Sequence, residues 1–120
     1  GGGGETRVID AGAIRLHVQS TVAEERGLLG ELADQFRAAN PKGSVLALVN
    51  PTLPNAIAVA VSDDLIAAGK DANALIKLLT TTHGGRGGGR KSFASGSLDV
   101  SAEPVATESL GPMLEAWTAS

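Results

Sequence analysis

Eight consecutive residues, Gly84–Lys91, combine glycine with positive charge in the order Gly-Gly-Arg-Gly-Gly-Gly-Arg-Lys. Glycine allows positive φ and lets backbone N–H groups come close to a ligand. A run of N–H groups beside guanidinium groups suits an anionic oxygen, above all that of a phosphate. The chemistry predicted for this stretch is therefore phosphate binding. The alternative is an exposed connecting loop whose arginines only keep it soluble.

The expected ligand contacts are the glycines, the cations and the first hydroxyl of this region. They are Gly84, Gly85, Arg86, Gly87, Gly88, Gly89, Arg90, Lys91 and Ser92. A P-loop does not fit, because a glycine is required where Arg90 stands when the pattern starts at Gly85. The predicted order of helix, loop and strand is also the reverse of the P-loop order. The dinucleotide fingerprint fails at its last glycine and for the same reason of order.

No set of residues in the sequence is typical of a catalytic or metal site. The two histidines, His17 and His83, have no neighbouring nucleophile or metal-ligand partner, and the chain has no cysteine. Arginine stays charged and is a poor proton-transfer group. The residue types favour binding over turnover, so we expect no catalytic residues, no metal and no cofactor in this domain.

Composition narrows the class of partner. The 120 residues carry a net charge of −3, which argues against binding nucleic acid through bulk charge but leaves a local basic site open. One Trp, two Phe and no Tyr leave few rings for a base-stacking platform. The apolar runs are too short to cross a bilayer, so no membrane partner is expected. The absence of cysteine fits a reducing compartment, and we expect a cytoplasmic location.

The chain is long enough for one domain with one substantial core. The glycines at the start resemble a linker and there is no initiator Met, so we expect a domain taken from a longer protein. We predict a linker or N-terminal extension over residues 1–12 and a single α/β nucleic-acid-binding domain over residues 13–120.

The first half of the chain predicts strands and one helix. Thr6–Asp10 and Ala13–Gln19 have extended character, and in the second the apolar residues alternate with polar ones. This alternation places His17 on the polar face, where an ordinary surface histidine is expected. Thr21–Glu24 has capping-box spacing, which predicts an amphipathic helix through about Ala39.

Two nearly continuous apolar runs, Ser44–Asn50 and Ala56–Ser62, predict strands that are covered on both faces. The short connection between them, Pro51–Asn55, predicts an antiparallel hairpin. The acidic pair Asp63-Asp64 that follows has no neighbouring His or further acid. We therefore expect a turn or a helix cap there rather than a metal site.

The second half predicts a helix from about Ala72 to Thr82, ended by Gly84 in a left-handed conformation. The glycine stretch is then expected as a loop, followed by a strand over Ser92–Leu98 and a loop over residues 99–107. Apolar residues at i, i+3, i+4 and i+7 predict a closing helix; they are Leu110, Met113, Leu114 and Trp117. Together the elements predict an α/β fold, a small mixed β-sheet with amphipathic helices packed on it.

From about Ala13 to Leu98 the chain resembles the C-terminal domain of alanyl-tRNA synthetases, a domain family that is also appended to DHH phosphoesterases. The resemblance rests on Leu32-Ala33-Asp34 in the first helix, on Val59–Leu65 (Val-Ala-Val-Ser-Asp-Asp-Leu) and on the Gly84–Arg90 stretch. The last of these is the most specific. The resemblance implies a fold like that of the DHH-associated domain.

The domain that this chain resembles is, in the synthetases, a tRNA-binding bridge without an active site of its own. The resemblance therefore implies a non-catalytic tRNA-binding C-terminal module of an alanine–tRNA ligase, which supports aminoacylation and editing by the parent enzyme. The implied partners are tRNA, with tRNA-Ala expected, and the catalytic and editing domains of the parent chain. A homodimer through the small-residue strands or the last helix is left open.

Two alternatives remain open at this point. The first is the substrate-binding domain of a DHH-family phosphoesterase, although its loop usually ends in His-Pro where this chain has Arg90-Lys91. The catalytic residues of such an enzyme would lie in a separate metal-binding domain. The second is a protein-interaction module that has lost RNA binding, which the net charge of −3 and the scarcity of aromatic residues favour.

Overall fold

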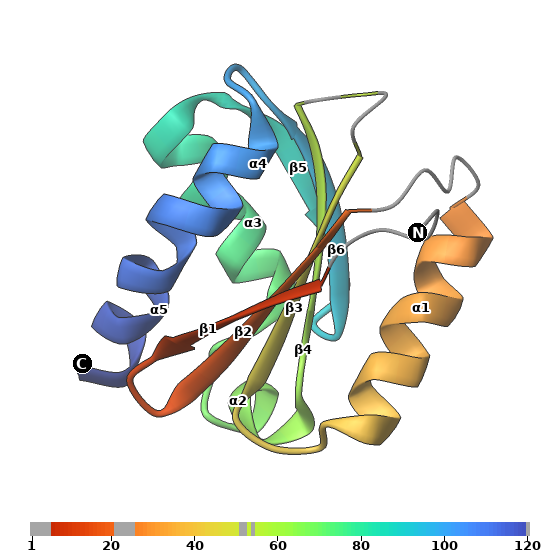
Figure 1. Ribbon diagram of the computed structural model, residues 1–120, viewed down its shortest axis with the longest axis vertical. Helices are drawn as coiled ribbons and strands as arrows, with labels where there is room; N and C mark the ends of the chain where they lie inside the picture. The colour runs from red at the N-terminus through yellow and green to blue at the C-terminus, as the bar shows by residue number, and fades with distance from the viewer. Residues whose placement is uncertain (1–5, 21–25, 51–52, 54, 120) are drawn as a thin grey trace.

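The computed structural model describes residues 6–20, 26–50, 53 and 55–119. Within these ranges six strands form one mixed sheet in the order β1-β2-β3-β4-β6-β5, with β2 and β3 parallel and every other pair antiparallel (Figure 1). The strands are β1 (Thr6–Ala11), β2 (Ile14–Ser20), β3 (Ser44–Val49), β4 (Ala56–Val61), β5 (Gly85–Gly89) and β6 (Phe93–Leu98).

Helices cover both faces of this sheet. The helical segments are α1 (Arg26–Ala39), α2 (Asp63–Ala67), α3 (Ala72–His83), α4 (Ala102–Pro104), the π-helical turn η1 (Val105–Ser109) and α5 (Leu110–Ala119). Figure 1 shows α1 on one face and α3 and α5 on the other. This arrangement confirms the predicted small mixed sheet with amphipathic helices packed on it. Among the described residues, no helix is both long enough and apolar enough to span a membrane.

The central strands are buried on both faces, as their continuous apolar runs predict. In β3, Val45 and Val49 join the core under α3 and α5, whereas Leu46 and Leu48 join a smaller core under α1. Side chains alternate between the faces of a strand, so an all-apolar strand fits only where both faces are covered. On β4 the α1 face carries Ala58 and Ala60, among others, and these small residues let α1 pack close to the sheet.

The first strand belongs to the sheet. β1 pairs with β2 along its whole length, from Thr6 opposite Gln19 to Ala11 opposite Ile14. The boundary expected between an extension and the domain, at residues 12 and 13, therefore falls inside this hairpin. From Thr6 onward the described chain is part of the domain.

The first helix is confirmed, although its predicted capping box over residues 21–24 lies outside the described residues. At its end the N–H of Asn40 donates to the carbonyl oxygen of Phe36 at 2.8 Å. Arg37 in the last turn donates through Nε to the carbonyl oxygen of Val61 at 3.0 Å and forms an ion pair with Asp63. Asp63 therefore ties α1 to the end of β4.

Asp64, the second member of the acidic pair, also has a structural role. Its carboxylate accepts the N–H of Gly43 at 2.9 and 3.0 Å and the hydroxyl of Ser62 at 2.5 Å. Burial alone would raise the pKa of Asp64, but hydrogen bonds from Ser62 and Gly43 outweigh it, so the pKa is lowered. The carboxylate thus holds the start of β3 against α2. The pair lies in the first turn of α2, after the cap residue Ser62, rather than in the predicted turn or cap position.

The loop predicted over residues 99–107 is wrong, because the chain is helical from Ala102 onward. The reason lies at Pro112, because a proline ordinarily fits only the first turn of a helix and so favours a late helix start. The π-helical turn η1 widens the helix just before this proline, with the N–H of Leu110 bonded to the carbonyl oxygen of Val105. A wider turn relieves the clash between a proline ring and the carbonyl four residues earlier. The helical segment can therefore start well before Pro112.

Candidate functional site

The glycine stretch, expected as a loop, is an edge strand. β5 pairs antiparallel with β6, and the ladder extends beyond it at both ends, where Arg90 N–H donates to Phe93 O at 2.9 Å and Asp99 N–H donates to Gly84 O at 3.0 Å. Gly84 ends α3 with φ 82° and ψ 150°. The positive φ agrees with the predicted helix terminator, but ψ is extended rather than left-handed. The chain therefore turns directly from α3 into the sheet.

Close packing explains why this strand is made of glycine. A Cβ at Gly87 would lie 2.5 Å from Cγ2 of Ile76 on α3 and 2.7 Å from Cα of Gly96 on β6. A Cβ at Gly89 would lie 2.7 Å from the carbonyl oxygen of Phe93. Real Cβ atoms do not approach heavy atoms this closely. These glycines are therefore required by the contacts among α3, β5 and β6, whether or not a ligand binds.

The strand also decides which backbone N–H groups a ligand could reach. Arg90 and Gly84 both bond to β6, so the alternation of an antiparallel ladder turns the even-numbered residues toward β6 and the odd-numbered ones outward. The outward N–H of Gly89 already donates to Oδ1 of Asn73 at 3.2 Å. This leaves the N–H groups of Gly85 and Gly87 on the open edge. The prediction that a run of neighbouring N–H groups faces the ligand is therefore wrong.

The cations of the stretch are exposed. Arg86, Arg90 and Lys91 all lie at the surface, and within the described residues none of them forms an ion pair with a carboxylate. The turn that carries the last two is anchored by its backbone, since Lys91 O accepts the N–H of Ala72 at 2.7 Å and Ser92 O accepts that of Val61 at 3.2 Å. A fixed backbone with unpaired guanidinium and ammonium groups is suited to binding an anion.

Two serines on β6 lie beside these cations. Gly87 faces α3, so the neighbouring Arg86 points to the opposite face of the sheet, which is the face that α1 partly covers. In the register Arg86 is opposite Ser97, and Gly88 is opposite Ser95. The hydroxyls of both serines have no hydrogen-bond partner in the described ranges. We call Arg86, Arg90, Ser95 and Ser97 the arginine–serine face.

The serines did not enter the predicted site. The alternation of Ser92–Leu98 holds the signal, because the buried Ala94 and Leu98 fall on one side and the serines on the other. Asn73, which caps the edge of β5, has no comparable signal in the sequence. Its position depends on how α3 packs on the sheet.

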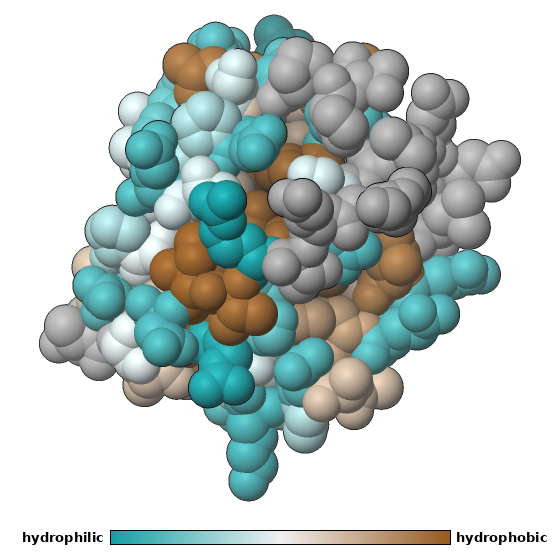
Figure 2. Space-filling view, in the orientation of Figure 1, coloured by the Kyte–Doolittle hydropathy of each residue, from teal (hydrophilic) through white to brown (hydrophobic). Residues whose placement is uncertain are grey.

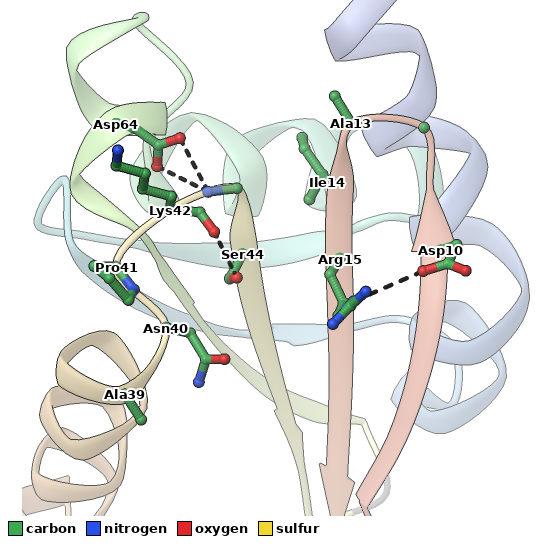
Figure 3. A pocket seen from close by; sticks show the side chains of 12 residues that line it. Asp10, Ala13, Ile14, Arg15, Ala39, Asn40, Pro41, Lys42, Ser44 and Asp64 are labelled. Atoms are coloured by element: carbon green, nitrogen blue, oxygen red, sulfur yellow. Dashed lines mark hydrogen bonds and ion pairs between the residues drawn. The ribbon is translucent and has the colours of Figure 1, made fainter.

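A second polar region lies away from β5, between the β1–β2 turn and the loop from α1 to β3. Figure 3 shows this hollow of about 610 Å³, with Arg15, Asn40 and Lys42 around it. Part of its charge is matched within the protein, because Arg15 is 3.8 Å from Asp10, and the carboxylate of Asp64 accepts the N–H of Gly43. Within the described residues, no group of three or more His, Asp or Glu side chains could hold a metal.

The two histidines do not contribute to the candidate site. The ring of His17 packs edge-on against Phe36 of α1, with centroids 4.9 Å apart and planes at 71°. His17 lies on the expected face of its strand but is partly covered, so it is not the ordinary surface histidine that was predicted. The reason is that α1 reaches over this part of β2. Burial, with a smaller contribution from Arg15, lowers the pKa of His17. The Nε2 atoms of His17 and His83 are buried and have no partner among the described residues.

Comparisons with known proteins identify relatives of the fold. No protein-family model matches the sequence, and no curated protein matches it. A solved structure of the C-Ala domain of alanyl-tRNA synthetase from Aquifex aeolicus is similar, with a TM-score of 0.71 and 23% identity over 91% of this chain and 98% of that one. The resemblance predicted from the sequence is thus confirmed at the level of the fold.

A second solved structure is that of a DHH-domain protein described as belonging to a family of ribosomal proteins. It is similar with a TM-score of 0.56 and 18% identity, over 97% of this chain and 27% of that one. Both identities are low, so the two likenesses establish the fold alone.

Proposed function

We propose that this domain is a non-catalytic tRNA-binding module of an alanyl-tRNA synthetase, with the cations of the β5–β6 hairpin as its contact to the phosphate backbone. The observation that carries the proposal is the group of three exposed cations, Arg86, Arg90 and Lys91, without ion-pair partners among the described residues. The likeness to the C-Ala domain of a synthetase supports the choice of tRNA as the ligand.

The chemistry of the hairpin favours recognition of backbone and shape. Arginine and lysine bind phosphate oxygens regardless of sequence. The outward N–H groups of Gly85 and Gly87 add two further donors on the same edge. Phe93, the aromatic residue nearest to the cations in the chain, is partly buried against the core under α1, so it offers bases only part of one ring. A structured RNA such as tRNA presents its backbone without needing such a ring.

The test is the binding of an unmodified tRNA-Ala transcript to the 120-residue chain and to the double variant Arg86→Ala/Arg90→Ala over a range of salt concentrations. Removing two phosphate contacts should weaken binding and reduce the slope of log K against log salt by about 1–2. A double variant with unchanged affinity and slope would show that the hairpin is not the contact.

The chain offers a matched control in Arg7→Ala/Arg15→Ala. These two exposed arginines lie on β1 and β2, at the other edge of the same sheet. The control removes the same net charge, so a loss through the overall field alone would affect both double variants equally. We expect the control to keep most of the affinity. A tRNA of another identity then tests whether tRNA-Ala is preferred.

The likeness to a DHH-domain protein supports one other function, the substrate-binding domain of a phosphoesterase. The hairpin could then hold the phosphodiester while a separate domain cleaves it. The two functions differ in the parent protein: phosphodiester cleavage by the full-length parent would favour the phosphoesterase, and alanylation of tRNA would favour the synthetase. A chain that binds no tRNA at low salt would instead favour a protein-interaction module.

A further inference from the structure

Resting on the proposed function, we infer that Ser95 and Ser97 contact ribose 2′-hydroxyl groups, so that the arginine–serine face reads the sugar as well as the phosphate of an RNA backbone. Arginine meets phosphates that RNA and DNA share. The serines supply the contact that only RNA can complete.

The register places these groups side by side. Ser97 is directly opposite Arg86, and Cβ atoms of directly opposed residues lie about 5 Å apart on one face. Ser95 lies two residues along β6 on the same face, about 7 Å away at the usual rise of a strand. Its opposite residue is Gly88, which has no side chain to cover the hydroxyl. A backbone that binds Arg86 therefore passes within reach of both hydroxyls.

The hydroxyls are available for such a contact. Ser97 is exposed and Ser95 is partly exposed, and neither side chain has a hydrogen-bond partner among the described residues. On this face, β4 contributes Ala56 opposite Ser97 and Ala58 opposite Ser95, and these alanines offer no polar group that could satisfy a hydroxyl. A serine hydroxyl both donates and accepts, as the 2′-hydroxyl does, so the two form a hydrogen bond in either direction.

The two neighbouring strands, β5 and β6, thus contact different parts of the RNA backbone. The cations of β5 supply affinity that depends on salt, whereas the hydroxyls of β6 supply short-range hydrogen bonds that depend on the sugar. Removing the serines should consequently change the preference among sugars while leaving the salt dependence in place.

The experiment compares an RNA hairpin with the same hairpin carrying 2′-O-methyl groups throughout. The methyl group removes the 2′-hydroxyl donor and crowds the 2′-oxygen against a donating serine, so it weakens the contact in either direction, but it keeps the helical form of RNA. We expect the 120-residue chain to bind the unmodified hairpin about 3- to 10-fold more tightly. In Ser95→Ala/Ser97→Ala this ratio should fall to about 1, through weaker binding of the unmodified hairpin, with an unchanged salt slope.

Two further variants serve as controls. Ser95→Thr/Ser97→Thr keeps both hydroxyls and suits a strand, so it should retain the preference even if the alanine variant folds poorly. Ser109→Ala removes a serine from η1, which packs with the core on the opposite face, and should behave like the wild type.

The outcomes separate this inference from the proposed function. A wild-type chain that binds neither hairpin contradicts the proposed function itself. A chain that binds both hairpins equally, or an alanine variant that keeps the wild-type ratio, overturns the role of the serines and leaves the phosphate contact standing.

Discussion

The two edge strands of the sheet, β1 and β5, are both covered on one face by a helix. They differ in whether the strand or the helix supplies the side chain that fills the contact. At β1 the strand supplies the side chain: Ile9 packs against the core, and a Cβ at Gly111 of α5 would lie 3.6 Å from Cγ2 of Ile9, an ordinary contact distance. At β5 the helix supplies the side chain: Ile76 of α3 reaches the backbone of the strand at Gly87.

The opposite faces of the two edge strands differ as well. β1 exposes Val8, which is 51% accessible, and Figure 2 shows apolar side chains over β1 with polar ones around them. β5 exposes Arg86 between glycines. The glycines of β5 are therefore required by the packing of α3 against the strand. The exposed cations of the stretch take no part in that packing and are available to bind an anion.

The largest effect is expected from Gly87→Ala. The added methyl group would meet Ile76 on one side and the backbone of β6 on the other, so strand or helix must shift. Overpacking of this kind costs about 2–3 kcal/mol. Denaturant unfolding measures it, and a loss below about 0.5 kcal/mol would mean that β5 and α3 are not in the close contact described.

At the other edge, Ile9→Ala should cost less. Ile9 is only partly buried, so removing its outer carbons forfeits part of the roughly 2–5 kcal/mol typical of a buried isoleucine, and we expect about 1–2 kcal/mol. The same unfolding experiment applies. A loss as large as that of Gly87→Ala would break the contrast between the two edges.

A glycine with room around it should respond in the opposite direction. Gly30 lies inside α1, and a Cβ there would have no heavy atom within 4 Å. Because alanine restricts the unfolded chain and favours the helix, Gly30→Ala should raise stability by about 0.5–1 kcal/mol. Destabilisation here would indicate that close packing is not what distinguishes Gly87.

The smallest effect concerns pH. His17, one strand in from the β1 edge, has a lowered pKa in the folded chain, so the unfolded chain takes up a proton first as the pH falls below the ordinary value of 6.5. The part of the folding stability that depends on neutral His17 is therefore fully present above pH 6.5 and is lost as the pH falls through the lower pKa of the folded chain.

Unfolding of wild type and His17→Leu at about pH 7.5 and about pH 5 tests this. The variant should lose less stability between the two conditions than the wild type, since leucine takes up no proton. Identical losses would place the pH dependence on other groups, with the Asp64 carboxylate as the next to examine at lower pH.

Local patterns were sufficient to predict most elements. The alternation in Ile14–Ser20, the continuous runs of β3 and β4 and the spacing around Leu75 and Leu79 each depend on residues close in sequence, and the structure confirms them. The composition of Gly84–Lys91 also located an exposed cationic region. In each case the pattern that supports the prediction lies within one strand or within a few turns of one helix.

The predictions that failed depend on partners far along the chain. A run of glycines has no strand propensity of its own, so β5 exists only because β6 and α3 hold it. His17 is partly covered only because α1 crosses its face. The helix after Ser101 is the exception, because it depends on a neighbouring π-helical turn that accommodates Pro112.

The sequence by itself therefore determined most of the helices and strands, the two-sided cores and the position of the cationic stretch. The tertiary structure alone decided that the glycine stretch is an edge strand, that only its odd-numbered N–H groups face outward, and that Ser95 and Ser97 lie beside Arg86. The physical reason is that periodicity records which face a residue occupies, whereas strand pairing and helix contact decide which residues share that face.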